Sequence, residues 1–282
     1  MIQQYRFAAM ESVAPHLAPK AASFILLGGL IAAMLGPELA YIGKDLHSVP
    51  FTGSFMLLSL MCLLGGLVML LFQPVALLEQ TQDEGGRALV EIMNSSLFWV
   101  AVMSATIGYA VMSYVMTATP VSMHVMEGHS LEDTKWVIQS HILSMFLPSL
   151  ISGYLIARFG EYRLMLAGLA AYALCLVIAL SGQDVMHYWL GLVLLGVGWN
   201  FLFVAGTVLL PKTYQLSERY KVQGFNDFFV FVFQAAASIS SGLVIYRVGW
   251  DRLLIYAVPL ILVQLFMVFI WRARKQGEGN GV

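Results

Sequence analysis

The stretch LGLVLLGVGWNFLFVAGTVLL, residues 190–210, decides the class of fold. It contains no charged side chain, and as a helix it is long enough to cross the roughly 30 Å hydrocarbon core of a bilayer. Other apolar runs of similar length precede and follow it, and the whole chain is 59% hydrophobic and only 11% charged. A soluble domain carries about 25% charged residues. The sequence therefore indicates an all-α polytopic membrane protein and excludes a soluble globular fold.

Eight apolar segments are predicted to span the membrane. Each is expected to be helical, because a backbone amide that faces lipid has no water to pair with and the strict alternation of a barrel strand is missing. The predicted spans are 21–41, 51–73, 98–120, 136–157, 163–182, 186–210, 223–246 and 250–271.

The distribution of lysine and arginine indicates the orientation of the chain. With the N-terminus in the cytoplasm, eleven of the 15 basic residues fall on the cytoplasmic side, as the positive-inside rule requires. We therefore expect both termini in the cytoplasm. The longest break between spans, residues 74–96, is then cytoplasmic as well. Its apolar flanks are equally consistent with a segment that lies on the membrane surface and with an unstructured linker.

Stripes of mainly polar residues, which also contain Pro148 and Gly196, recur at helical spacing in four of the spans. They are Thr106, Tyr109, Ser113 and Thr117 in the third, His141, Ser144, Pro148 and Ser152 in the fourth, Gly196, Asn200 and Thr207 in the sixth, and Asp227, Gln234, Ser238 and Ser241 in the seventh. Residues at such spacing share one helix face, so the pattern predicts a polar cavity enclosed by four helices. Alternatively, the hydroxyls bond carbonyls of their own helix, and small residues let neighbouring helices approach closely.

Five of these residues are candidates for a substrate or proton pathway: Thr117, His141, Asn200, Asp227 and Gln234. Asp227 is either a titrating carboxylate or a charge stabilised near the N-terminus of its helix. His141 either binds substrate or a proton, or is hydrogen-bonded within the bundle. Asn200, with Trp199 beside it, either contacts a ligand or joins neighbouring helices.

The sequence carries no signature of an enzyme, a cofactor or nucleic-acid binding. The motifs HExxH, GxSxG and Walker A are absent, and a net charge of -1 leaves no basic footprint. The loop MHVMEGHSLEDTK, residues 123–135, gathers histidines and carboxylates, but its spacing favours a hydrated loop over a zinc site. The expected partners are therefore the lipid bilayer and a small-molecule substrate, with no cofactor, no metal and no nucleic acid.

The stretch GYLIARFGEYRLM, residues 153–165, resembles the cytoplasmic G-x-L-a-D-r-x-G-r-k loop of the major facilitator superfamily of secondary transporters. The matching residues are Gly153, Leu155, Arg158 and Gly160. Ala157 stands where that loop has aspartate, and Glu161 and Tyr162 replace its basic pair, as in the degenerate copy of the second half. LGPELA, residues 35–40, resembles the fifth-helix antiporter motif, and MTATPVSM, VIQSH and QGFND resemble a bacterial branch of permeases.

This resemblance implies a division of the chain. The superfamily has twelve helices in two halves, and the chain aligns with it from about the fifth helix onward. Residues 1–73 would then be a surface segment and the last two helices of the N-terminal half, 74–96 the cytoplasmic linker, 97–275 a six-helix C-terminal half, and 276–282 a cytoplasmic tail. Four helices would be missing, so the resemblance implies either an oligomer or an N-terminal half encoded upstream.

The resemblance also implies a function. The expectation is a secondary-active transporter in the bacterial inner membrane that moves a small solute by alternating access, with proton coupling left open. The family's cavity helices in the C-terminal half correspond to the four striped spans, and Gly153, Arg158, Gly160 and Arg163 would form a gating loop. The competing interpretation is a truncated protein that does not transport and serves as a scaffold, sensor or assembly partner.

Overall fold

The computed structural model describes residues 18–71 and 86–279, and every regular element within them is helical. The helices are α2 Ala18–Gly43, α3 Thr52–Met69, α4 Leu89–Met93, α5 Ser96–Pro120, α6 Leu131–Phe146, α7 Ser149–Ser181, α8 Val185–Leu209 and α9 Arg219–Gly279. A π-helical turn, Val121–Met126, extends α5, and two 3-10 turns, Leu210–Thr213 and Leu216–Glu218, join α8 to α9. The predicted all-helical membrane fold is confirmed. Most of the predicted surface segment and much of the predicted linker lie outside the described residues.

Five helices in the described ranges are long and apolar enough to cross a membrane. One of them, α9, holds two predicted spans, and α7 holds the fifth and the end of the fourth, because one glycine interrupts the helical backbone in each. Gly160 has φ 79° and ψ 162°, and Gly249 has φ 79° and ψ 179°. Only glycine adopts this conformation readily, since it lacks a Cβ. Both glycines fall between predicted spans, and the number of eight spans stays a prediction.

The fourth predicted span, 136–157, is built from two helices. It combines α6 with the first part of α7, and the two meet at Leu147 and Pro148. Proline has no backbone N–H, so the carbonyl of Ser144 loses its usual helical donor at this point. The break therefore leaves backbone acceptors in the interior of the bundle that need other partners.

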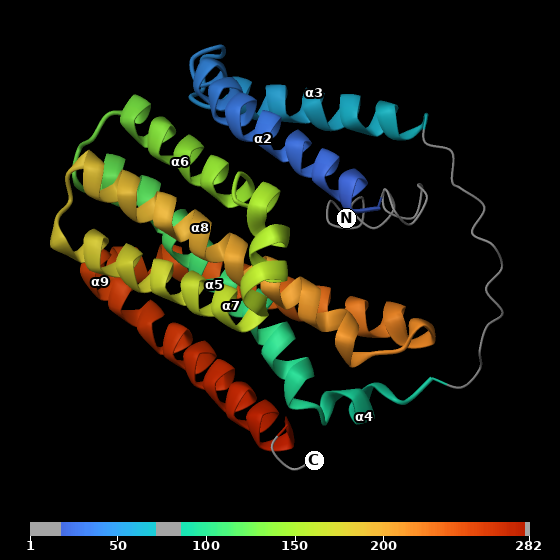
Figure 1. Cartoon of the computed structure of the whole chain (residues 1–282). Helices are drawn as coiled ribbons and strands as arrows, with labels where there is room; N and C mark the ends of the chain where they lie inside the picture. The colour runs from blue at the N-terminus through green and yellow to red at the C-terminus, as the bar shows by residue number, and fades with distance from the viewer. Residues whose placement is uncertain (1–17, 72–85, 280–282) are drawn as a thin grey trace.

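The arrangement of the helices places α5 at the centre. Of the residues in its membrane-spanning stretch, 78% are buried, a larger share than in the other candidate spans of the described chain, because both α8 and α9 pack along it. α6 and α7 pack in turn on α8. Figure 1 shows α2 and α3 as a pair on one side of this bundle, with α2 next to α6, and the last part of α9 on the opposite side.

Polar contacts join α2 to α6 near one end of the bundle. Lys135 Nζ donates to Glu38 Oε1 at 2.9 Å, and Gln139 Nε2 lies 3.2 Å from the same oxygen and 3.1 Å from the carbonyl of Met34. Lys135 Nζ also lies over the Tyr41 ring, 4.6 Å from its centroid. The α2–α3 pair thus contacts the bundle through α2. In α3 only 6% of the residues of the apolar stretch are buried.

An ion pair at the other end ties the segment before α4 to the loop before α9. The Arg87 guanidinium donates to both carboxylate oxygens of Glu218, at 2.9 and 2.8 Å, and the backbone N–H of Arg87 adds a third bond at 2.7 Å. The side chain of Glu218 is fully buried. The Arg87 hydrogen bonds, followed by the bond from the backbone N–H of Gln215, lower the pKa of Glu218 to about 2.

This ion pair predicts a pH-dependent contribution to stability. Because the pKa of Glu218 falls from 4.5 to about 2 on folding, its contribution is fully present above about pH 4.5 and is lost as the pH falls towards 2. Glu218→Gln should therefore lower the melting temperature at pH 7, and its difference from the wild type should shrink between pH 5 and pH 3. Differential scanning fluorimetry of the purified protein in detergent measures this.

The control is Glu127→Gln, which replaces an exposed carboxylate at the opposite end of the bundle. It should follow the wild-type curve throughout. A Glu218→Gln difference that stays constant over the whole pH range would contradict the assigned role of the Arg87 ion pair.

Candidate functional site

A line of close contacts joins α8 to the broken fourth span. Leu192, Gly196 and Asn200 follow one another at four-residue spacing on α8, so they lie on one face. His141 Nδ1 lies 2.8 Å from the carbonyl of Leu192, and because that oxygen can only accept, Nδ1 carries the proton. A Cβ on Gly196 would lie 2.7 Å from the carbonyl of His141, so α6 and α8 touch backbone to backbone here. We call this contact the α6–α8 seam.

Asn200 completes the seam at the break around Pro148. Its Nδ2 donates to the carbonyl of Met145 at 2.7 Å and also to Ser149 Oγ. Its Oδ1 accepts from Ser152 Oγ at 2.7 Å. One amide thus bonds the end of α6 and the start of α7, and it supplies a donor where the helical pattern is interrupted.

Burial separates the two predicted seam residues from any open cavity. Both His141 and Asn200 are 0% exposed. The polar atoms of Asn200 are occupied by the partners named above, while His141 Nε2 has no hydrogen-bond partner among the described residues. The geometry matches the alternative reading of these two residues, in which they join helices.

The other predicted pathway residues lie between α5 and α9. Thr117 Oγ1 is 3.1 Å from Ser238 Oγ, which joins the two helices. Gln234 and Asp227 are half-buried on the same face of α9, and Asn226 Nδ2 donates to Asp227 Oδ1 at 3.2 Å. The structure therefore brings Thr117, Gln234 and Asp227 to one interface and leaves His141 and Asn200 at another.

An aromatic cluster lies where all four striped helices meet. Its members are Tyr109 of α5, Phe146 of α6, Trp199 and Phe203 of α8, and Phe231 of α9. The Trp199 and Phe203 rings are stacked with centroids 5.1 Å apart, and the Tyr109 ring meets both edge-on. Trp199 is 4% exposed, and its indole Nε1 has no hydrogen-bond partner among the described residues.

One side of this cluster is open. Phe231 is 40% exposed, and its ring centroid lies 6.2 Å from that of Tyr109. On α9, Phe231 shares the face of Asp227 and Gln234, because it follows the first by four residues and precedes the second by three. The cluster and the half-buried polar residues of α9 thus form one surface, which we call the aromatic face.

The aromatic residues of this face are not among the candidate site residues that the sequence predicts. Phe203 and Phe231 sit in apolar runs, where a phenylalanine carries no signal beyond hydrophobicity. Tyr109 belongs to a polar stripe and Trp199 adjoins Asn200, but the sequence pattern singles out neither of them as a site residue. A usable signal was the spacing of Trp199 and Phe203, four residues apart, which predicts stacked side chains on one helix face.

The residues of the predicted gating loop surround the Gly160 turn. Gly153 is exposed, and Arg158 Nη1 donates to the Tyr154 hydroxyl at 2.8 Å. Arg163 is exposed and lines a cavity of about 300 Å³ together with Gly160. Lys212, just after α8, donates to Glu161 at 2.5 Å and so ties the turn to the end of α8.

The histidine-rich loop contains hydrogen bonds to the backbone. His124 Nδ1 lies 2.7 Å from the carbonyl of His129, and His129 Nε2 lies 2.8 Å from the carbonyl of Gln183. Within the described ranges, no group of three or more His, Cys, Asp or Glu side chains is arranged to hold a metal ion.

Comparisons with known proteins connect this architecture to transporters. Residues 107–281 match the sequence profile of the Major Facilitator Superfamily. A riboflavin transporter of Brucella anthropi is 37% identical over 272 residues, which are 94% of this chain and 68% of that protein. An uncharacterised MFS-type transporter of Bacillus subtilis is 31% identical over 98% of this chain and 67% of its own length.

A solved structure has the same fold. The outward-facing crystal structure of a bacterial homologue of the iron transporter ferroportin superposes with a TM-score of 0.63 at 15% identity. The alignment covers 94% of this chain and 66% of that one. The chain thus spans about two thirds of the length of the proteins that it matches.

The seam predicts the effect of removing the Asn200 amide. Asn200→Ala should lower the melting temperature, because the Met145 carbonyl loses its side-chain donor in a setting without water. The expected loss is about 1 kcal/mol, typical of hydrogen bonds between membrane helices. Thermal unfolding of the purified protein in detergent is the measurement.

Ser113→Ala provides the matched control, since Ser113 is also buried but, within the described residues, its hydroxyl bonds only the neighbouring Met112 Sδ, at 3.9 Å. That variant should melt like the wild type. If Asn200→Ala left the melting temperature unchanged and weakened only solute binding, Asn200 would be a ligand contact instead.

Proposed function

Because this chain belongs to the major facilitator superfamily of secondary transporters, we propose that it carries a planar aromatic solute, of which riboflavin is the first candidate, across the membrane. The solute would bind at the aromatic face between α5, α8 and α9. We place the protein in the inner membrane of a bacterium, with both of its termini in the cytoplasm. The protein is a transporter and not an enzyme, and its substrate is a small molecule.

The observation that carries the substrate proposal is the aromatic face itself. Trp199 and Phe203 present stacked rings, and Phe231 is exposed at the edge. Planar heteroaromatic rings bind well to such surfaces by offset stacking and edge contacts. The buried Trp199 indole N–H has no partner among the described residues. Such a group costs about 1–3 kcal/mol, and a ligand carbonyl would satisfy it. The isoalloxazine ring of riboflavin supplies both a planar surface and carbonyl acceptors.

The relatives support this choice of solute. The riboflavin transporter of Brucella anthropi aligns along almost the whole chain, so its helices include equivalents of α5, α8 and α9. Transport by alternating access requires two helical halves that move about a central site. Since α3 is exposed along its length, we propose that it packs against another helical unit of the working transporter, such as a second copy of this chain.

Half-buried polar residues would line the rest of the pathway. Gln234 of the aromatic face and Thr117 of α5 would offer hydrogen bonds to a polar tail such as a ribityl chain. Asp227 lies on the same face of α9, four residues before Phe231. We assign it the coupling role, in which a carboxylate takes up and releases a proton during the transport cycle.

The substrate proposal predicts uptake of riboflavin that depends on the aromatic face. Cells that cannot make or import riboflavin should accumulate radiolabelled riboflavin when they express this chain. Trp199→Ala should lower kcat/KM at least tenfold, and Trp199→Phe, which keeps a ring but removes the donor, should raise KM about threefold to tenfold. Lumichrome, which has the ring system alone, should compete, whereas ribitol should not.

Trp136→Phe is the matched control, because Trp136 stacks on Trp189 outside the aromatic face. It should transport like the wild type. Absence of uptake above background would refute riboflavin as the substrate. Uptake that is insensitive to both Trp199 variants would instead place the binding site elsewhere.

The coupling proposal predicts a change in pH dependence. Wild-type uptake should fall as the external pH rises, because fewer protons are available for coupled entry. Asp227→Asn should make the uptake rate independent of the external pH while solute exchange across the membrane continues. The exposed carboxylate variant Asp251→Asn should retain the wild-type profile. An Asp227→Asn variant with the wild-type profile would exclude this residue from coupling.

A further inference from the structure

Two cavities of about 300 and 320 Å³ lie at the end of the bundle that contains the Gly160 turn. The first is lined by residues of the turn and the last part of α9, and the second by the start of α5, the end of α8 and the last part of α9. They share Glu161 and Trp271. Together they form one recessed region, which we call the arginine recess.

Positive charge dominates the arginine recess. Arg163 and Arg272 line the first cavity, and Lys212 and Arg274 line the second. Glu161, the one carboxylate in either lining, pairs with Lys212 at 2.5 Å. None of the three arginines forms an ion pair with a carboxylate in the described part of the chain. The recess thus holds unneutralised guanidinium groups, which bind phosphate oxygens well.

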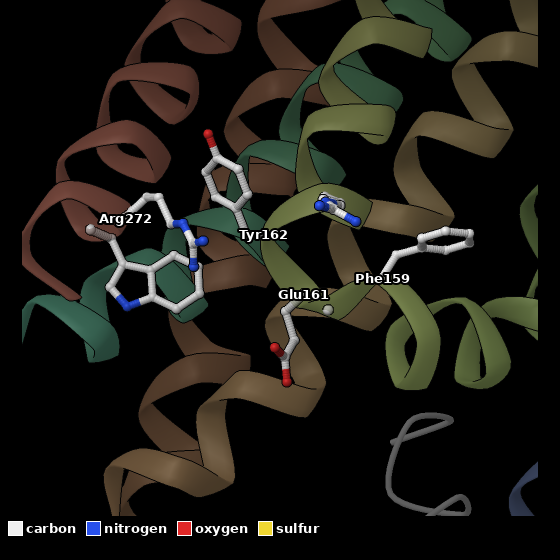
Figure 2. Close-up of a pocket in the computed structure, with 7 residues that line it drawn as sticks. Phe159, Glu161, Tyr162 and Arg272 are labelled. Carbon is white, nitrogen blue, oxygen red and sulfur yellow. The ribbon is translucent and has the colours of Figure 1, made fainter. Parts of the chain in front are cut away.

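Aromatic rings of the kind found at membrane surfaces line the arginine recess. Arg272 lies over the Tyr162 ring, 5.4 Å from its centroid, and Figure 2 shows both on one side of the turn, with the Glu161 carboxylate pointing away from them. Trp271 lines both cavities. Tyrosine and tryptophan are enriched at the boundary between headgroups and hydrocarbon.

An exposed apolar stripe leads away from the recess. The Tyr162 ring meets that of Phe269, with centroids 6.4 Å apart. Phe269, Phe266 and Leu262 follow at helical spacing on one face of α9 and are 50%, 66% and 55% exposed. A molecule whose phosphate sits in the recess would therefore find an apolar path for a hydrocarbon chain beside it.

We propose that the arginine recess binds the phosphate of an anionic phospholipid, whose acyl chain lies along the Phe269 stripe. The charge and the cavities fit a phosphate in general. The stripe favours a lipid over a soluble phosphate, because only a lipid uses both features. Basic pockets between membrane helices bind anionic headgroups in this way. Such a lipid would join the Gly160 turn to the C-terminal part of α9.

The test measures lipid binding by the full chain. Native mass spectrometry of the protein in detergent, with cardiolipin, phosphatidylglycerol or phosphatidylcholine at equal concentration, should show retention of the two anionic lipids over phosphatidylcholine. Arg163→Gln combined with Arg272→Gln should weaken cardiolipin binding about tenfold or more. Each single variant should show part of that loss, so the result does not depend on the double variant alone.

The matched control replaces two exposed arginines beside the other glycine turn, Arg247→Gln with Arg252→Gln, and should leave lipid retention unchanged. Equal losses in both double variants, or no preference for anionic lipids, would overturn the proposal. Displacement of cardiolipin by millimolar inorganic phosphate, with the same dependence on Arg163 and Arg272, would assign the recess to a soluble anion and overturn the lipid assignment. Gel filtration and melting temperature establish that each variant is folded.

Discussion

Pro148 interrupts the backbone hydrogen bonds between α6 and α7 inside a membrane bundle, where hydrocarbon supplies no donor to replace them. The remaining geometry of the C-terminal bundle follows from how that gap is filled. Asn200 reaches across from α8 to the Met145 carbonyl and to the first turn of α7, and this fixes the rotation of α8 about its axis. Once α8 has that rotation, Gly196 faces the carbonyl of His141 and the two helices can touch.

The same rotation decides which side chains remain for function. With Gly196 and Asn200 turned towards α6, α8 packs the Trp199 ring against Tyr109 of α5 and Phe146 of α6. The polar residues of α8 thus join helices, while its aromatic rings pack into a cluster whose exposed edge is Phe231 of α9. A rigid seam beside a ring cluster with one exposed edge is a suitable basis for a site that must keep its shape while helices around it move.

The features that sequence could predict were those set by local chemistry. The apolar spans follow from hydrocarbon thickness, and the two turns in α7 and α9 fall in the gaps that were expected around Gly160 and Gly249. The helical spacing of polar residues correctly grouped His141 with Ser144, and Gly196 with Asn200. Spacing shows which residues share a face, but not which neighbour that face meets, so the stripes of α6 and α8 could not be distinguished from a cavity lining. The Arg87–Glu218 pair was out of reach for the same reason, since its partners are 131 residues apart.

The glycine turns have a consequence for biosynthesis. Only residues 158–162 and 247–249 separate the predicted spans on either side of Gly160 and Gly249, and the backbone leaves the helical conformation at the glycine alone, so little chain is available to keep the second segment in water while the first enters lipid. For each of these pairs of predicted spans we therefore expect entry into the membrane as one helical hairpin. A longer loop at Gly160 or Gly249 would uncouple these partners and turn one concerted membrane entry into two separate ones.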